Sequence, residues 1–257
     1  MEDSRDNWLH HWQQFAEAAS ANPAQRMRHR LILTLLQRLL QNRNHIKLLD
    51  IGSGQGDLLF QVHQWRADAD LLGIELSESG VAIARQKVPR ATFVAANLFA
   101  PPPGLTHYMR WATHATCSEV LEHVDDPVAF LRQARQYLAE EAVTIVTVPG
   151  GYVSAFDRHI GHRRHFSAPL LRAVLHQAGF QVERIFRAGF PFFNLYRLLV
   201  IARGERLVDD ATAEAHGATT RLLGVAMSVF DWLLRFNVSD SPFGWQLVAV
   251  AYNPRME

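Results

Sequence analysis

The sequence predicts an α/β fold with a doubly wound, mostly parallel sheet of seven strands, N-terminal helices and a helical insertion before the last strand. From residue 46 onward, short apolar runs alternate with stretches of helical periodicity, as is typical of strand–helix–strand units. The first of these runs ends in a glycine-rich turn at 52–56, which is followed by a helical pattern. The apolar fraction of 48% and the charged fraction of 20% exclude a disordered chain.

The individual elements follow from these patterns in chain order. Helices are expected at 8–19 and 24–41, because Asn22-Pro23 is a helix start signal and leucines then recur at helical spacing. The expected strands are 46–51, 70–75, 91–95, 111–117, 142–148, 180–187 and 245–252. Further helices are expected at 57–67, 78–87, 127–139 and 168–178. Since a helix that joins two strands of one sheet brings them parallel, most neighbouring strands should run parallel.

Residues 189–243 interrupt this alternation with two apolar, aromatic-containing stretches joined by a polar link. We interpret them as a helical insertion within one domain overall. Residues 1–45 then form an N-terminal helical cap, and 46–188 together with 244–257 form the core.

Charge and cysteine content limit the class of protein. Lys and Arg number 26 against 25 Asp and Glu, so the net charge gives no reason to expect a nucleic-acid partner. The single cysteine, Cys117, cannot form an internal disulfide. The N-terminus lacks a signal-peptide pattern, and no uncharged apolar run reaches the roughly 20 residues that span a bilayer. We therefore expect a cytoplasmic protein without a transmembrane segment.

The glycine-rich turn, Asp50-Ile51-Gly52-Ser53-Gly54-Gln55-Gly56, is the most informative motif. Glycines let a ligand approach the backbone, and the helix that follows directs free N–H groups beyond the end of the strand. Glu75 ends the next expected strand, where an acidic side chain can accept hydrogen bonds from both ribose hydroxyls. Together these features predict a site for an adenosine-type nucleoside.

This motif resembles, position for position, the D-x-G-x-G-x-G turn of class I S-adenosylmethionine-dependent methyltransferases. The glycine spacing departs from the G-x-G-x-x-G of dinucleotide sites, and the carboxylates Asp50 and Asp57 flank the turn. Such a pair repels a pyrophosphate but suits a ligand with an ammonium and a sulfonium group. The resemblance covers roughly 46–187 and 245–254, and it implies a Rossmann-like fold with S-adenosylmethionine as cofactor.

Three further segments match that family in order. The third strand ends at Asn97, where the family usually has an acidic residue that binds the adenine amino group. Residues 117–124 resemble its E-V-L-E-H-V segment, although the fourth strand lacks the usual Asp near its start, and 146–150 resemble its fifth strand. The resemblance implies that the donor is held by Asp50, Gly52, Ser53, Gly54, Gly56, Glu75, Leu76, Asn97, Leu98 and Ser118. In this family N-terminal helices often close over the cofactor, so Gln25, Arg26 and Arg30 are further candidates.

Methyl transfer from a sulfonium is an in-line displacement, so a protein need only align the reactants, exclude water and, for a hydroxyl acceptor, remove a proton. His123 is a candidate general base, and the alternative is a structural histidine. Glu119, Glu122 and His123 could instead converge on a divalent metal if their turn is helical, as a similar cluster does in plant small-RNA 2′-O-methyltransferases. Our prediction is that no metal is bound, and an RNA 2′-O-methyltransferase remains the alternative function.

A second histidine segment lies after the fifth strand. His162 and His165 are acid–base candidates, and Arg163 and Arg164 are expected to meet a carboxylate or phosphate of the acceptor. The alternative is a solvated loop in which Arg164 pairs with Asp157. Ser167 is expected to cap the next helix.

The insertion suggests what the acceptor is. Its apolar residues could cover an apolar pocket, form a homodimer interface or lie on a membrane surface. We expect Tyr152 and Phe193 to contact a small, lipophilic or aromatic acceptor, such as one from natural-product biosynthesis, that is methylated on oxygen. A non-catalytic binding protein that kept the fold is the remaining alternative.

Overall fold

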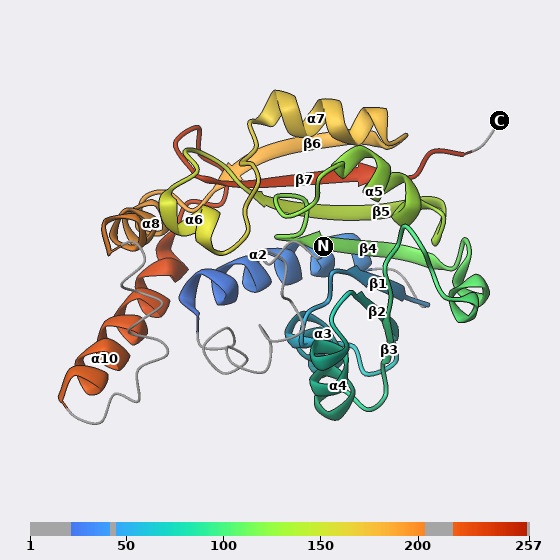
Figure 1. The fold of residues 1–257 in the computed structure, drawn as a ribbon, viewed down its shortest axis with the longest axis horizontal. Coiled ribbons are helices and arrows are strands. Elements are labelled where there is room, and N and C mark those ends of the chain that lie inside the picture. Colours follow the sequence, from blue (N-terminus) through green and yellow to red (C-terminus); the bar gives the residue numbers. More distant parts are fainter. Residues whose placement is uncertain (1–21, 42–44, 204–217, 256–257) are drawn as a thin grey trace, which may run out of the picture.

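The seven predicted strands form a single sheet in the computed structural model, which describes residues 22–41, 45–203 and 218–255. The strands are β1 (Lys47–Ile51), β2 (Asp70–Glu75), β3 (Thr92–Ala95), β4 (Ala112–Ser118), β5 (Leu138–Pro149), β6 (Gln181–Ala188) and β7 (Gln246–Tyr252). Their order is β3-β2-β1-β4-β5-β7-β6 (Figure 1). All neighbours run parallel except β7, which is antiparallel to both β5 and β6. The predicted mostly parallel, doubly wound sheet is therefore confirmed.

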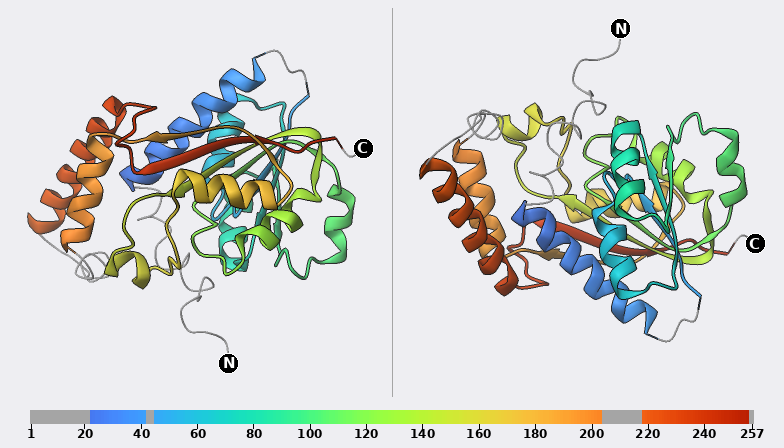
Figure 2. Two further views of the ribbon diagram at one scale, coloured as in Figure 1. Left: turned by 90° about the horizontal axis from the view of Figure 1, so that it is seen from above. Right: turned by 90° about the horizontal axis from the view of Figure 1, so that it is seen from below.

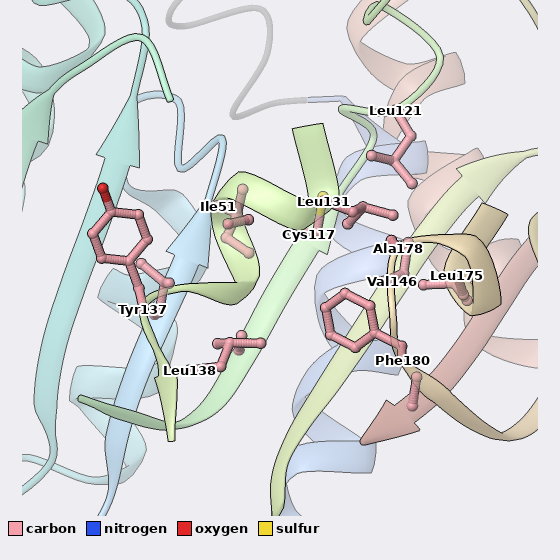
Figure 3. Packing of buried hydrophobic residues seen from close by; sticks show 14 of the residues in the cluster. Ile51, Cys117, Leu121, Leu131, Tyr137, Leu138, Val146, Leu175, Ala178 and Phe180 are labelled. Carbon is pink, nitrogen blue, oxygen red and sulfur yellow. The ribbon is translucent and has the colours of Figure 1, made fainter. Parts of the chain in front are cut away.

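Helices cover both faces of this sheet. The buried clusters join α2 (Pro23–Leu40), α3 (Asp57–Trp65) and α4 (Glu78–Lys87) to one face, and α5 (Pro127–Arg135) and α7 (Ala168–Gln177) to the other. Successive strand residues point to opposite faces, so in β1 Leu48 packs with the first group and Leu49 with the second. Figure 3 shows the second cluster, in which Leu131 of α5 and Leu175 of α7 approach Val146.

Several helices begin where the sequence predicts. Asn22 caps α2 by accepting a hydrogen bond from the Ala24 N–H, and Ser167 caps α7 as predicted. The helix expected at 127–139 is shorter, because Leu138 pairs with Ala112 and begins β5. Two short elements had not been predicted, the 3₁₀ helix η1 (Pro103–Tyr108) and α6 (Ala155–His159), since neither is long enough to show periodicity. The helix expected at 8–19 lies outside the described residues.

The insertion contains α8 (Phe192–Arg203), α10 (Ala218–Leu233) and the 3₁₀ turn η2 (Leu234–Phe236). α8 and α10 lie side by side at one end of the molecule, next to α2 (Figure 2). A small apolar cluster of Ala24, Met27, Phe193 and Leu234 joins α8 and η2 to α2. Among the described residues, no helix combines the length and the apolar character needed to cross a membrane.

Candidate functional site

The sheet order places a crevice beyond β1 and β4. β1 connects forward to β2 on one side and lies against β4 on the other, and doubly wound sheets bind ligands where the order reverses in this way. A pocket opens there between the glycine turn, the end of β4 and the first turns of α2. It is lined by Gln25, Arg28, His29, Asp50, Gly52, Ser53, Gly54, Gln55, Asp57, Leu58, Ser118 and Glu119.

Gly52 shows why the turn requires glycine. Its φ of +73° lies in the left-handed region, which side-chain-bearing residues rarely adopt. A Cβ at this position would also lie 2.4 Å from Cγ2 of Val120. Both the backbone conformation and the close approach of the loop after β4 therefore require a residue without a side chain.

Glu75 connects the end of β2 to the glycine turn. Its carboxylate accepts hydrogen bonds from the Gly54 N–H, at 2.9 Å, and from the Ser77 N–H, at 3.0 Å. Burial raises the pKa of Glu75, and the hydrogen bonds from Ser77 and Gly54 oppose that shift. A carboxylate has about four acceptor positions, so Glu75 can hold the turn and still accept bonds from a ribose.

The sequence suggests two free negative charges, Asp50 and Asp57, on either side of the turn. The structure does not show two free charges there. Asp57 pairs with Lys87 and accepts hydrogen bonds from Gln25 and Gln55. Asp50 is buried and accepts a hydrogen bond from Thr116 Oγ1 at 2.6 Å. Burial raises the pKa of Asp50 from 3.8 to about 7 in spite of that bond. The electrostatic potential of the pocket is therefore less negative than the residue types alone imply.

Asp50→Asn tests this assignment through the pH dependence of folding. Because the folded-state pKa is raised, Asp50 favours folding at low pH, and this contribution is lost as the pH rises from about 4 to about 7. A pKa difference of this size between the folded and unfolded states corresponds to roughly 4 kcal/mol. We expect Asp50→Asn to be more stable than wild type by about 2–4 kcal/mol above pH 7 and similar to it near pH 4, in urea unfolding. Asp70→Asn removes an exposed carboxyl as a control, and a pH-independent difference for Asp50→Asn would contradict the shifted pKa.

The other predicted donor residues lie along the same edge of the sheet. Ser118 lines the pocket, and its hydroxyl is hydrogen-bonded to that of Thr147. Leu76 is exposed after β2, and Leu98 is buried after β3. Asn97 is exposed, and its side-chain oxygen accepts a hydrogen bond from the Phe99 N–H at 3.0 Å. The oxygen expected to bind an adenine amino group is therefore already part of a local turn.

Sequence reasoning missed Arg28 and His29, which line the pocket from α2. Of the α2 candidates it did name, Gln25 lines the pocket, whereas Arg26 and Arg30 pair with Asp231 of α10. Residues three and four positions apart share a helix face, so the choice of Gln25 could have identified Arg28 and His29.

The three histidines predicted to be catalytic come together at the same edge of the sheet. The rings of His123 and His162 meet edge to face, with their centroids 4.7 Å apart. His162 Nδ1 lies 3.0 Å from His165 Nε2. The side chains of His162 and His165 are 8% and 1% exposed, and His123 is half-buried. Burial, assisted by His123, lowers the pKa of His162 to about 2, so its imidazole is neutral.

Asp157 supports these histidines from α6. Arg197 of α8 donates one hydrogen bond to each carboxylate oxygen, both at 2.9 Å, and the carboxylate lies within 3.9 Å of His162 and His165. Burial raises the pKa of Asp157, but Arg197 outweighs it and brings the pKa to about 2. The predicted alternative in which Arg164 pairs with Asp157 is wrong, because Arg197 occupies that place.

The remaining acceptor residues are not gathered around one pocket. Arg163 pairs with the carboxylate of Asp125, and Arg164 donates to the Asp125 carbonyl oxygen. Tyr152 is 71% exposed on the loop after β5. Phe193 is 3% exposed inside the cluster that joins α8 to α2, so the structure does not support a contact between it and an acceptor.

The alternative in which Glu119, Glu122 and His123 converge required a helical turn, and the structure has a bend at Glu119 and a short turn at 121–123 instead. Glu119 has a φ of +57°, and its carboxylate accepts hydrogen bonds from Gln246 and Thr147 and lies 3.6 Å from Arg28. It thereby faces the pocket beside the glycine turn. Glu122 is fully buried, and burial together with the nearby Glu119 carboxylate raises its pKa.

Comparison with known proteins gives one family. A family model described as a methyltransferase domain matches residues 24–185. No curated protein sequence matches the chain.

Solved structures share the fold over most of the chain. The [4+2]-cyclase SpnF is 18% identical with a TM-score of 0.57, over 88% of this chain and 80% of that one. A Thermotoga maritima protein is described as a SAM-dependent methyltransferase, possible histamine N-methyltransferase. It is 16% identical with a TM-score of 0.58, over 96% of this chain and 100% of that one. Haemonchus contortus phosphoethanolamine N-methyltransferase 2, in complex with S-adenosyl-L-methionine, is 16% identical with a TM-score of 0.57, over 87% of this chain and 52% of that one.

Proposed function

The chain belongs to the methyltransferase-domain family, and from this premise we propose that it transfers a methyl group from S-adenosylmethionine to an oxygen atom of a small acceptor. The observation that carries the proposal is that the donor pocket and the histidine cluster of His123, His162 and His165 lie at the same edge of the sheet. Ser118 and Glu119 line the pocket from the end of β4, and His123 follows in the same loop.

The residues of the pocket suit the donor. The backbone of Gly52 and Gly54 lines the pocket, and Glu75 offers further acceptor positions to ribose hydroxyls. Within the part of the chain that the structure describes, the buried Ser53 hydroxyl has no hydrogen-bond partner, so it can bond a ligand. Arg28 is the cation on the pocket wall that is placed to meet the donor's carboxylate.

Oxygen is the proposed methyl acceptor because a hydroxyl must lose its proton on methylation, whereas a free amine attacks through its lone pair. A neutral imidazole can take that proton. His123 is half-buried, and the more deeply buried His162 packs against it. We therefore assign the proton-accepting role to His123, and the roles of holding and polarising its ring to His162 and His165.

We propose a lipophilic or aromatic acceptor because apolar helices of the insertion lie beside the histidine loop. α8 is joined to that loop through the Arg197–Asp157 pair. Its exposed side chains include Leu195, Leu198 and Leu199, which suit contact with an apolar molecule, a second copy or a membrane surface. An RNA acceptor is disfavoured, since Arg163 and Arg164 contact Asp125.

Glu75→Ala tests the donor site by calorimetry with S-adenosylmethionine. The substitution removes the proposed ribose contacts and leaves the Gly54 N–H without its acceptor, so we expect roughly 10- to 100-fold weaker binding. Glu75→Gln keeps an acceptor oxygen and should lose less. Glu78→Ala, an exposed carboxyl in the first turn of α4, is the matched control. Unchanged affinity in Glu75→Ala would contradict the assignment of Glu75.

Methyl transfer needs its own measurement, because one fold supports many chemistries, and a cyclase shares this one. Isotope-labelled S-adenosylmethionine, incubated with the chain and a cell extract, should give a labelled small product with the label on oxygen. Donor binding without any labelled product would favour a non-catalytic binding protein, and label on nitrogen or carbon would contradict the proposed acceptor atom.

A further inference from the structure

Glu122 is a buried carboxylate that the fold itself does not satisfy. It is fully buried in the loop after β4. Among the residues that the structure describes, neither of its side-chain oxygens has a hydrogen-bond partner. Placing such a group in the interior is costly unless something compensates it, and an unsatisfied buried polar group in a native fold needs an explanation.

Two histidines lie close enough to this carboxylate to bind the same metal ion. One ligand atom from each of Glu122, His123 and His162 can be chosen so that all three lie within 4.8 Å of one another. A cation about 2.1 Å from each atom in tetrahedral geometry needs ligands about 3.4 Å apart, and side-chain rotation can close the difference. The three side chains are therefore close enough to form a metal site after small rotations.

The fold holds the two contributing loops together. β4 and β5 are parallel neighbours, with Ser118 opposite Thr147, so the loops that follow them leave the same edge of the sheet. The Arg163 N–H donates to the Glu122 carbonyl oxygen at 2.8 Å, which fixes the backbone of one loop against that of the other. Glu122 and His162 are thus brought together by the sheet, although they are distant in the sequence.

The ring of His162 is also oriented by contacts to its Nδ1 atom. Its Nδ1 contacts His165 Nε2 at 3.0 Å and lies 3.9 Å from Asp157 Oδ1. Asp157 is itself fixed by Arg197 and by the Ser154 hydroxyl. Metal-binding histidines usually have such a partner on their second nitrogen, which fixes the tautomer and the orientation of the ring.

We propose that Glu122, His123 and His162 bind a divalent first-row transition-metal ion of the Zn²⁺ or Co²⁺ type. Two imidazole nitrogens and one carboxylate suit these ions better than Mg²⁺ or Ca²⁺, which prefer oxygen ligands. Three protein ligands leave a coordination position open for water or a substrate oxygen. This proposal departs from the sequence-based prediction of no metal, and it replaces Glu119 by His162 in the ligand set. It rests on the geometry of the three side chains and does not depend on the proposed methyl transfer.

Cobalt binding tests the site directly. The full chain, stripped with a chelator and dialysed, is titrated with Co²⁺ and followed by visible absorption, calorimetry and thermal unfolding. We expect one Co²⁺ per chain, an absorption band of low-symmetry cobalt that Zn²⁺ abolishes by displacement, and a Tm raised by about 5–10 °C at a hundredfold excess over Kd. Neither S-adenosylmethionine nor an acceptor is present, so the outcome is separate from the test of the proposed function.

Variants locate the ion. Glu122→Gln keeps the shape of the side chain and His162→Ala removes an imidazole, and each should weaken Co²⁺ binding at least about 100-fold. His159→Ala removes an exposed neighbouring histidine outside the ligand set, and we expect Kd within about threefold of wild type. Circular dichroism checks that each variant is folded, and His123→Gln replaces any that is not. Substoichiometric binding by wild type, or wild-type affinity in both Glu122→Gln and His162→Ala, would overturn the proposal.

Discussion

His123→Ala should lower kcat by about 10²–10⁴-fold once an acceptor is identified, with little change in the affinity for S-adenosylmethionine. Removal of a positioned general base costs a rate factor of this size. His123 is half-buried in the loop that continues from the pocket residues Ser118 and Glu119, but it does not itself line the pocket. The effect should therefore fall on turnover rather than on donor binding.

The measurement is single-turnover transfer of labelled methyl groups, with donor affinity from calorimetry. His159→Ala, a histidine outside the cluster in α6, is the control and should be close to wild type. Near-normal turnover in a folded His123→Ala protein would remove His123 from the chemistry.

The cation proposal gives His123 a second role, and a chelator separates the two. If chelation lowers wild-type turnover as much as His123→Ala does, the histidine acts through the bound ion, which would lower the pKa of the acceptor hydroxyl. If chelation leaves turnover intact while His123→Ala reduces it, the imidazole itself takes the proton.

The fold could be predicted because its signals are local. The apolar runs at β1, β2 and β3 and the caps at Asn22 and Ser167 each lie within a few residues of the structure that they determine. The antiparallel placement of β7 between β5 and β6 has no such signal, since it depends on how a distant segment returns to the sheet.

The same distinction holds in the candidate site. The glycine turn and Glu75 could be recognised from spacing alone. Whether Glu119 lies beside Glu122 and His123 depended on a helical turn that spacing cannot establish, and the φ of +57° at Glu119 makes a bend instead. Arg197 could not be assigned to Asp157, because the two residues are 40 positions apart and meet only after α8 folds back. Distances within one element can be read from a sequence, whereas pairings between elements require the tertiary structure.

Arg197→Ala should destabilise the protein by about 3–5 kcal/mol, because it leaves the Asp157 carboxylate buried without its partner. At this chain length the loss corresponds to a Tm lower by roughly 6–20 °C. Arg197→Lys keeps the charge but cannot donate two parallel hydrogen bonds, so an intermediate loss is expected. Arg172→Ala, an exposed arginine in α7, is the control.

The pH dependence distinguishes a lost ion pair from lost packing. The wild-type pKa of Asp157 is lowered to about 2, so its stabilising contribution is present at neutral pH and is lost as the pH falls from about 4 towards 2. Without Arg197 the pKa should rise, because burial then dominates, and the destabilisation should be largest at neutral pH and smaller near pH 4. In the double variant Arg197→Ala with Asp157→Asn no buried charge remains, so it should lose less than the sum of the single changes. A loss that is additive and equal at pH 4 and pH 7 would mean that Arg197 acts through packing and that the insertion is not joined to the histidine cluster by charge.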